Sequence, residues 1–214
     1  MFILGLTGSI GMGKSTAAAA LRRLGVPVHD ADRSVHRLLG KGGRAVPLVA
    51  RAFPGTVRDG AVDRLRLGAI VFADARALKR LEAILHPLVR REERAFLAAV
   101  AHRRAPVAVL DVPLLYETGG ERRCDAVVLV TAPEMVQMSR VLSRPGMTMA
   151  KLAGIRSRQM PDRAKRARAD FIVPTGLSKR EAARKLACAV AAARRRRGRH
   201  WRPERPGVWG EAHA

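Results

Sequence analysis

Cysteine, aromatic residues and long apolar runs are scarce in this chain of 214 residues. The two cysteines, Cys124 and Cys188, lie far apart and belong to no Cys-x-x-Cys or paired-histidine pattern, which argues against a disulfide framework and a zinc site. Aromatic residues make up 4% and are not interleaved with basic ones, so we expect no specific nucleic-acid partner. No apolar run reaches the roughly 18 residues of a membrane-spanning helix, and a basic leader is missing. We therefore expect a cytoplasmic protein with no membrane partner.

Acidic residues are also few, since 18 Asp and Glu stand against 41 Lys and Arg and give a net charge of +23. Such an excess is typical of proteins that bind nucleic acid, a membrane surface or a strongly anionic small molecule. Most of the cations are Arg, a skew that the codon composition of the source genome would also produce, and the sequence leaves both explanations open. Residues 194–214 carry seven Arg and two Glu, so the excess is spread over the whole chain.

Strands alternate with helices along the chain, which predicts an α/β fold with a parallel sheet flanked by helices. Short apolar runs predict strands at residues 2–7, 28–32, 106–111, 125–130 and 170–173, the second of which ends in carboxylates. Helical spacing predicts helices at residues 14–24, 133–144, 148–159 and 178–194, and an almost entirely helical stretch at 33–104 with breaks at 40–43, 54–55 and 87.

A glycine-rich turn follows the first predicted strand. Gly8-Ser9-Ile10-Gly11-Met12-Gly13-Lys14-Ser15 has the spacing Gly-x4-Gly-Lys-Ser/Thr of a phosphate-binding loop. Glycines let the backbone wrap a phosphate chain, Lys14 reaches the β- and γ-phosphates, and Ser15 can ligate Mg²⁺. The helix at Thr16 directs its positive end at the same anion. We therefore predict a nucleotide-binding site made of Gly8, Gly11, Met12, Gly13, Lys14, Ser15 and Thr16.

The class of nucleotide-binding protein follows from what surrounds this loop. The chain contains no Asn, so the base-reading Asn/Thr-Lys-x-Asp motif of a GTPase is missing. Asp111 is followed by Val112-Pro113 where a motor protein would have Glu. A small-molecule kinase remains, and it needs a substrate lobe and a mobile basic lid that exclude water.

The expected kinase domain spans residues 1–193. We assign its core to about 1–32, 106–135 and 168–193, its helical substrate lobe to about 33–105, and its helical lid to about 136–167. Residues 194–214 form a basic tail rich in Pro and Gly, and we expect it to be disordered.

Three carboxylates are candidates for the chemistry. Asp30 and Asp32 lie at the end of the second predicted strand, where ligand sites of open α/β sheets fall. We expect one of them to accept the proton of the acceptor hydroxyl, with Asp32 favoured, and the other to cap the helix that begins near Arg33. Asp111 ends a buried strand, and it either binds Mg²⁺ through water or pairs with a nearby Arg.

Basic residues of the predicted lid are candidates for neutralising phosphate charge. Arg140 and Arg144 are four residues apart and share one helix face, and Arg158 lies near the end of the lid. We assign Arg140 a catalytic role. A solvated charged face is the alternative for each of these residues.

The chain resembles the dephospho-coenzyme A kinase family over nearly all of residues 2 to 193. Besides the phosphate loop, the motifs that carry this resemblance are Asp30-Ala31-Asp32, Val62-Asp63-Arg64 with Leu67-Gly68 and Val71-Phe72, Leu81-Glu82-Ala83-Ile84-Leu85-His86-Pro87, Pro113-Leu114-Leu115-Tyr116-Glu117, Arg158-Gln159-Met160-Pro161 and Ala169-Asp170-Phe171. His86-Pro87 and Pro113-Leu114-Leu115 are far more specific than the phosphate loop, which many P-loop proteins share.

The resemblance implies phosphorylation of the ribose 3′-hydroxyl of dephospho-coenzyme A by ATP with Mg²⁺, the last step of coenzyme A synthesis. It places the catalytic Asp at Asp32 and implies that Asp32, Arg64, His86 and Leu114 contact the substrate. Helix-end packing is the alternative for His86, since Pro87 follows it. The chain departs from the family after the last strand, where Pro174-Thr175-Gly176 replaces an Asp-Asn pattern near the adenine. We expect backbone groups of these three residues to bind the adenine in place of that pattern.

Two other functions stay open. One is a P-loop kinase for a nucleoside monophosphate or a polyol, and the other is an ATP-regulated protein that binds nucleic acid, as the charge of +23 suggests. We expect a monomer whose partners are ATP and dephospho-coenzyme A. The sequence leaves the preference for ATP over GTP open.

Overall fold

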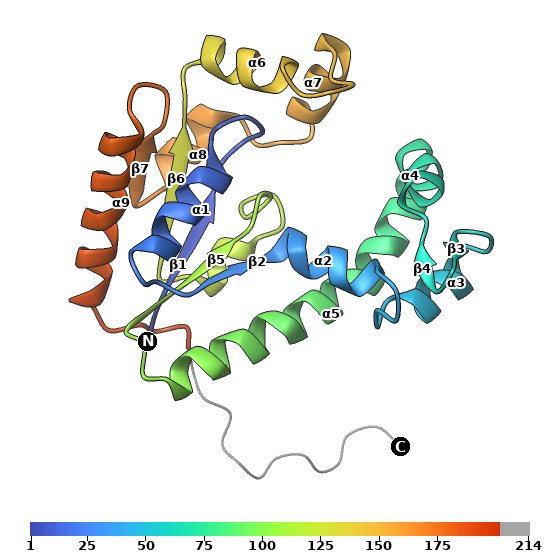
Figure 1. The fold of residues 1–214 in the computed structure, drawn as a ribbon, viewed down its shortest axis with the longest axis horizontal. Helices are drawn as coiled ribbons and strands as arrows, with labels where there is room; N and C mark the ends of the chain where they lie inside the picture. The colour runs from blue at the N-terminus through green and yellow to red at the C-terminus, as the bar shows by residue number, and fades with distance from the viewer. Residues whose placement is uncertain (202–214) are drawn as a thin grey trace.

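The structure is a computed structural model that describes residues 1–201. Its centre is a parallel sheet of five strands in the order β2-β5-β1-β6-β7 (Figure 1). The strands are β1 (Phe2–Thr7), β2 (Val28–Asp30), β5 (Val107–Asp111), β6 (Ala126–Thr131) and β7 (Phe171–Pro174). The bounds of all five strands were predicted to within one or two residues, because each strand is a short apolar run followed by a polar residue or a turn. The expected α/β fold is confirmed.

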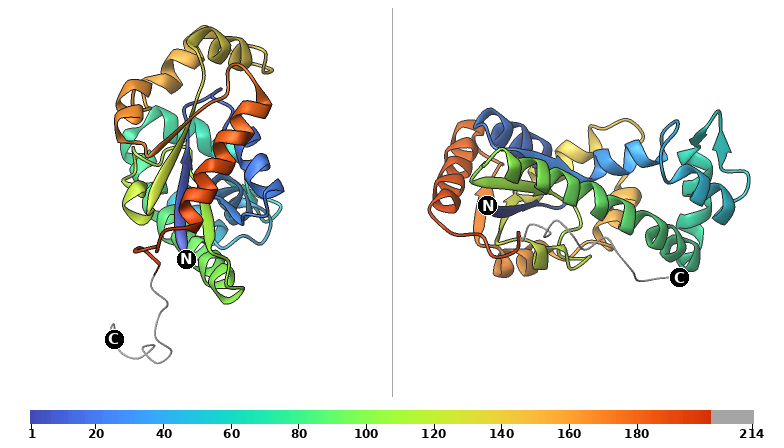
Figure 2. Two further views of the ribbon diagram at one scale, coloured as in Figure 1. Left: turned by 90° about the vertical axis from the view of Figure 1, so that its left-hand side faces the viewer. Right: turned by 90° about the horizontal axis from the view of Figure 1, so that it is seen from below.

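Helices cover both faces of the sheet (Figures 1 and 2). α1 (Lys14–Arg23) and α9 (Lys179–Arg194) pack on one face, where side chains such as Leu21 and Leu186 meet alternate residues of the strands. α5 (Ala75–His102) covers the other face through Leu97 and Val100, together with the segment after β5. Because both faces are covered, the strands read as continuous apolar runs.

The substrate lobe lies between β2 and β5 in the chain and to one side of the sheet in space (Figure 1). It contains α2 (Ala31–Leu39), α3 (Val46–Ala52), the antiparallel pair β3 (Val57–Arg58) and β4 (Ala61–Val62), α4 (Arg64–Ala73) and α5. It has a hydrophobic cluster of its own, which includes Leu38, Phe53, Leu67 and Leu81. The lobe is therefore a second packing unit.

The β3–β4 hairpin was not predicted, since residues 33–104 were expected to be helical. Its two-residue turn consists of Asp59 at φ 49° and Gly60 at φ 76°. Asp-Gly is the pair that tight hairpins favour, because both central residues of such a turn need positive φ. The signal was present, but the surrounding helical spacing outweighed it.

The predicted helix break at Pro87 is also wrong, because α5 runs through this residue without interruption. A proline inside a helix removes one hydrogen bond and leaves the carbonyl four residues earlier without a partner. Pro87 and Ala83, which carries that carbonyl, are both exposed, so water can satisfy the group. Leu81 and Leu85 hold the helix against the lobe from its other side.

The lid follows β6 and comprises three helices, α6 (Glu134–Leu142), α7 (Met149–Arg156) and α8 (Asp162–Arg168). The helices α6 and α7 were predicted, whereas no helix was predicted at the residues of α8. Figure 1 shows α6 and α7 beyond one end of the sheet, with α8 between them and the strands. A short 3-10 helix, Gly120–Arg123, precedes β6.

The last described residues do not behave as the expected tail. α9 ends at Arg194 as predicted, but the backbone amides of Arg199 and His200 both donate to Asp125 Oδ1, at 2.5 and 3.2 Å. Trp201 packs against the cluster under α5. The expectation of disorder from residue 194 onward is therefore wrong for residues 194–201, and residues 202–214 lie outside the described residues.

Two further expectations concern cysteines and membranes. Cys124 and Cys188 are both free, and burial raises the pKa of the Cys124 thiol to about 12, so this thiol is not a reactive nucleophile. Within residues 1–201, every helix is too short or too polar to cross a bilayer.

Candidate functional site

The phosphate loop joins β1 to α1 at the carboxyl edge of the sheet, where ligand sites of such sheets lie. Gly11 and Gly13 have φ values of 75° and 85°, a region that favours glycine. Gly13 is the N-cap of α1 and offers no side chain to its free amides. A Cβ on Gly8 would collide with Val130 of β6. The loop therefore lies tight against the sheet and directs a helix N-terminus at its ligand.

Lys14 is held at the base of the site by Asp111, with 2.7 Å between Nζ and Oδ1. The alternatives for Asp111 were water-mediated binding of Mg²⁺ and an Arg partner; its partner is a lysine of the phosphate loop itself. Burial raises the pKa of Asp111, the Lys14 charge opposes that rise, and the negative charges of Asp30 and Asp32 add to it. Several carboxylates thus crowd the ends of β2 and β5, where a cation would be stabilised.

Asp30 and Asp32 have different positions. Asp30 is the N-cap of α2, and its Oδ1 accepts a hydrogen bond of 3.0 Å from the Arg33 amide. Asp32 lies in the first turn of α2 and lines the cavity over the phosphate loop. The carboxylate that is free to face a ligand is therefore Asp32.

The cavity over the phosphate loop has a volume of about 640 Å³, within the usual range for a small-molecule site. It brings together Gly8 to Thr16, Asp32, Arg140 and Arg144, all of which the sequence had singled out. The structure thus unites a phosphate loop, a carboxylate and two lid cations in one cavity.

Arg140 is fixed by several contacts. Its Nη2 donates to the Thr175 carbonyl at 2.7 Å, and its Nη1 donates to the Thr175 hydroxyl at 3.1 Å and to the Gly11 carbonyl at 3.5 Å. Arg144 lies two residues beyond the end of α6, so the expected shared helix face with Arg140 is wrong, although both residues line the cavity. Contacts within the protein therefore position the guanidinium of Arg140 beside the phosphate loop.

Two glutamines, which are the only ones in the sequence, bind the phosphate loop from the lid. The Ile10 amide donates to Gln159 Oε1 at 3.2 Å, and the Ile10 carbonyl accepts from Gln137 Nε2 at 2.7 Å. The sequence analysis gave neither glutamine a role. Their rarity was a usable signal, since an Arg-rich lid has few other side chains that both donate and accept.

Asp111, which binds Lys14, does not line this cavity itself, and four other predicted residues also lie outside it. Arg64 Nη1 is 3.0 Å from His36 Nδ1 of α2, within the lobe. His86 is exposed on α5, and Leu114 follows β5 with 40% of its surface exposed. The Arg158 guanidinium lies 5.4 Å from the centre of the Phe72 ring of α4, so in this structure it joins the lid to the lobe and does not face the phosphate loop.

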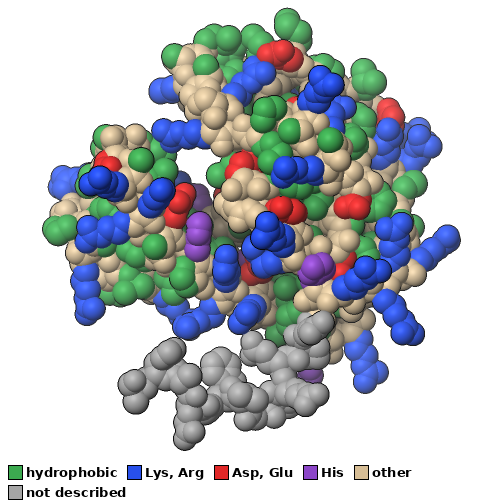
Figure 3. Space-filling model, turned by 180° about the vertical axis from the view of Figure 1, so that it is seen from behind, with side chains coloured by type: hydrophobic (Ala, Val, Ile, Leu, Met, Phe, Trp, Pro, Cys, Tyr) green, Lys and Arg blue, Asp and Glu red, His purple; other side chains and the backbone are tan. Residues whose placement is uncertain are grey.

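Figure 3 shows a hollow between the lobe and the rest of the molecule, with Lys and Arg side chains over both parts. On this face the cations do not gather into one stripe. A continuous basic stripe is what a nucleic-acid groove requires.

A parallel sheet of this strand order, with a phosphate loop after its first strand, a helical insertion and a basic lid, defines a P-loop kinase. The shikimate kinase of Acinetobacter baumannii shares this fold, with a TM-score of 0.51 at 17% identity over 90% of this chain and 94% of that one.

Sequence comparison identifies the family. The family model for dephospho-CoA kinase matches residues 2–179, and the chain belongs to that family. It is 57% identical to the dephospho-CoA kinase of Rhodospirillum rubrum over 94% of this chain and 99% of that protein. It is 65% identical to that of Paramagnetospirillum magneticum over 78% of each. The crystal structure of TT1252 from Thermus thermophilus superposes with a TM-score of 0.79 at 37% identity, over 89% of this chain and 96% of that one.

Proposed function

We propose that this kinase transfers the γ-phosphoryl group of ATP to the ribose 3′-hydroxyl of dephospho-coenzyme A, giving coenzyme A and ADP. One observation carries the proposal within the family: the phosphate loop, Asp32 and Arg140 line one cavity. Asp32 comes from α2, the first helix of the lobe, so the lobe begins at this cavity.

Lys14 and Arg140 act on the phosphates. Charge spreads over the three equatorial oxygens of the γ-phosphoryl group as it moves, and fixed cations stabilise that charge without reorganising. Lys14 is oriented by Asp111 and Arg140 by Thr175, so both are preorganised. Arg144 and, after lid closure, Arg158 add further positive charge.

Asp32 acts as the general base. It accepts the proton of the 3′-hydroxyl as the oxygen attacks the γ-phosphorus, and the ADP oxygen leaves on the opposite side. Asp30 holds the start of α2 and thereby orients Asp32. Arg64, His86 and Leu114 bind the substrate from the lobe and from the segment after β5.

The donors near Lys14 fit a magnesium ion. Ser15 supplies a hydroxyl at the first turn of α1, and Asp111 supplies a carboxylate whose pKa burial raises. These are hard oxygen ligands, which Mg²⁺ prefers together with phosphate oxygens. When bound, the ion would neutralise charge on the phosphates. Within residues 1–201, no group of three His, Cys, Asp or Glu could hold a metal ion, so phosphate oxygens of the nucleotide would have to supply further ligands.

The lid and the lobe exclude water from the transfer. A closed cleft prevents ATP hydrolysis and strengthens every charge interaction inside it. We further propose that the enzyme acts in the cytoplasm as a monomer, without a membrane or nucleic-acid partner. Light scattering that gave twice the mass of one chain would contradict the monomer.

The test is a coupled assay of ADP release from purified protein with ATP and Mg²⁺. Dephospho-coenzyme A is compared with adenosine monophosphate, shikimate and gluconate at equal concentrations. We expect turnover with dephospho-coenzyme A at least a hundredfold faster than with the others. Preferred turnover of a polyol or a nucleoside monophosphate would show that the protein is a P-loop kinase for that substrate. Stimulation of ATP turnover by nucleic acid would favour an ATP-regulated protein that binds nucleic acid.

A further inference from the structure

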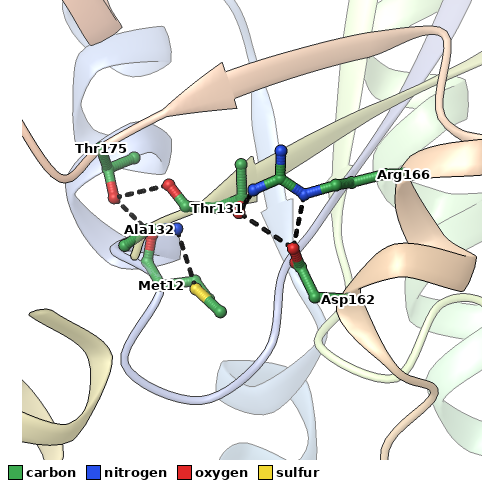
Figure 4. Close-up of polar contacts among 6 residues, drawn as sticks. All are labelled: Met12, Thr131, Ala132, Asp162, Arg166 and Thr175. Atoms are coloured by element: carbon green, nitrogen blue, oxygen red, sulfur yellow. Dashed lines mark hydrogen bonds and ion pairs between the residues drawn. The ribbon is translucent and has the colours of Figure 1, made fainter. Parts of the chain in front are cut away.

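The hydroxyl of Thr175 lies at a junction of the site (Figure 4). Thr175 follows β7, and its amide donates to the Thr131 carbonyl at 2.8 Å, which continues the pairing with β6. Its Oγ1 donates to the Met12 carbonyl at 2.7 Å and lies 3.3 Å from the Thr131 carbonyl. The residue that replaces the family's Asn therefore binds the phosphate loop.

The same residue holds Arg140. Nη1 of Arg140 donates to the Thr175 hydroxyl and Nη2 donates to the Thr175 carbonyl, so both arms of the guanidinium bind one residue. A fork of two parallel donors fixes the orientation of the group as well as its position. Thr175 is thus a bridge between the phosphate loop at Met12 and a cation of the lid.

Hydrogen bonds hold Thr131 and Met12, the two residues whose carbonyls lie next to the Thr175 hydroxyl (Figure 4). The Thr131 hydroxyl accepts from Arg166 Nη2 at 2.5 Å and donates to Asp162 Oδ2 at 3.2 Å, which joins the end of β6 to α8. The Ala132 amide donates to the Met12 sulfur at 3.0 Å. The carbonyls of Met12 and Thr131 are therefore held in place, and the Thr175 hydroxyl has a fixed acceptor.

The Thr175 side chain has little hydrogen-bonding capacity left for a base. Its one proton goes to Met12 and one of its two lone pairs accepts from Arg140, so it has no donor to offer and cannot supply the paired donor and acceptor that read a base edge. The Thr175 amide and carbonyl are engaged as well. We expect backbone groups of residues 174–176 to bind the adenine. The Thr175 amide is not available for this, so the donor is the backbone amide of Gly176. A Cβ on Gly176 would collide with Pro133, so glycine allows this close approach.

We propose that Thr175 is a positioning residue that sets the angle of Arg140 toward the γ-phosphate and has no part in selecting the base. The inference rests on the proposed function, because it assigns Arg140 to the transferring group. Removing the hydroxyl breaks the link from Arg140 through Thr175 to Met12 and leaves the guanidinium with the Thr175 and Gly11 carbonyls alone. Its angle is then less fixed, so the transfer step slows while ground-state binding of ATP is nearly unchanged.

The experiment compares Thr175→Val, which keeps the shape and removes the hydroxyl, with Thr175→Ser, which keeps the hydroxyl. Rates are measured with dephospho-coenzyme A and with ATP or GTP, and the Kd of ATP is measured by titration. We expect Thr175→Val to lower kcat about tenfold, with the Kd of ATP and the ATP-over-GTP ratio within twofold of the wild type. Thr175→Ser should stay within twofold in every measurement. A decrease of less than threefold in Thr175→Val, or a collapse of the ratio, would overturn the proposal.

A double-mutant cycle with Arg140→Ala tests whether the effect passes through Arg140. Once the guanidinium is absent, Thr175→Val should lower kcat by less than twofold, because nothing is left to position. An equal decrease in both backgrounds would overturn the proposal and leave Thr175 as support for the phosphate loop alone. If Thr175→Val does not fold, Thr175→Ala takes its place in the cycle. A wild-type protein inactive on dephospho-coenzyme A would instead refute the proposed function.

Discussion

The lid and the substrate lobe flank the same cavity, yet they are attached to the sheet by different contacts. The lid base, residues 159–168, is joined to the sheet by buried polar groups. Lys165 is fully buried with its Nζ 2.8 Å from Glu117 Oε1, and Gln159 binds Ile10. The lobe packs around its own hydrophobic cluster and meets the rest of the chain through α2 and α5.

This difference separates a preformed half of the site from an adjustable one. The phosphate loop, the lid base and Arg140 form one hydrogen-bonded unit with the sheet, so contacts within the protein fix the geometry of the nucleotide side. The lobe meets the lid through the exposed contact of Arg158 with Phe72. Domain closure requires such weakly attached parts. We infer that the acceptor side moves while the nucleotide side stays fixed.

The largest expected effect comes from breaking the attachment of the lid base. Lys165→Met leaves the half-buried Glu117 carboxylate without its cation and with the Met160 amide as its remaining donor. We expect it to lower the free energy of unfolding by about 3 kcal/mol, measured by urea denaturation. Lys185→Met is the matched control, since Lys185 and Glu181 form an exposed pair on α9 at 3.8 Å, and its effect should be below about 0.5 kcal/mol. Similar effects for the two variants would show that the lid base is not fixed by this pair.

Lys14→Ala breaks the nucleotide side without touching the lobe. We expect kcat to fall at least about a hundredfold, about 2.7 kcal/mol, because a fixed cation is lost from the γ-phosphate. Steady-state rates with dephospho-coenzyme A measure this, with circular dichroism to verify the fold. Lys185→Ala, outside the cavity, should keep the wild-type rate. Near-normal turnover by folded Lys14→Ala would remove the phosphate-loop assignment.

Asp32→Asn tests the border between the two halves. We expect kcat to fall about thirtyfold, about 2 kcal/mol, with the Kd of ATP nearly unchanged, because the amide cannot accept the proton. The decrease is modest because a loose transition state forms little bond to the attacking oxygen. Asp30→Asn is the control and should cost less than threefold, since Asn caps a helix as well as Asp does. If Asp30→Asn proves the more damaging change, the base is Asp30.

The smallest expected effect concerns the contact between lobe and lid. Phe72→Ala removes the ring under Arg158, and an exposed contact of this kind contributes about 0.5–1 kcal/mol. We expect the KM for dephospho-coenzyme A to rise about threefold while the KM for ATP does not change. Leu65→Ala, also exposed on α4, should change neither. A rise in the KM for ATP as well would mean that lobe and nucleotide side are one unit.

The sequence was sufficient for the sheet and for the nucleotide side. Apolar runs gave the strands, and the spacing from Gly8 to Ser15 has a mechanical cause that holds in any context. Ser178-x-x-Glu181 is a helix-capping pattern, which predicts that α9 starts here. In the structure the Ser178 hydroxyl accepts from the amides of Arg180 and Glu181. These features depend on neighbours in sequence.

The sequence was insufficient where the partner is distant. Nothing local indicates that Gln137 and Gln159 meet at Ile10, more than 120 residues away. Arg158 was placed over the phosphates because a lid arginine usually serves there, yet its nearest ring comes from α4. The roles of Arg64, His86 and Leu114 stay predictions, since in this structure they lie outside the cavity over the phosphate loop.

The placement of tryptophan makes this enzyme convenient for optical work. Its two tryptophans, Trp201 and Trp209, both follow α9 in sequence, and Trp201 packs under α5. Neither belongs to the lobe or the lid in sequence. An indole introduced at position 72, beside Arg158, would therefore report the approach of lid and lobe, and its change in emission could be followed in real time as each substrate is added.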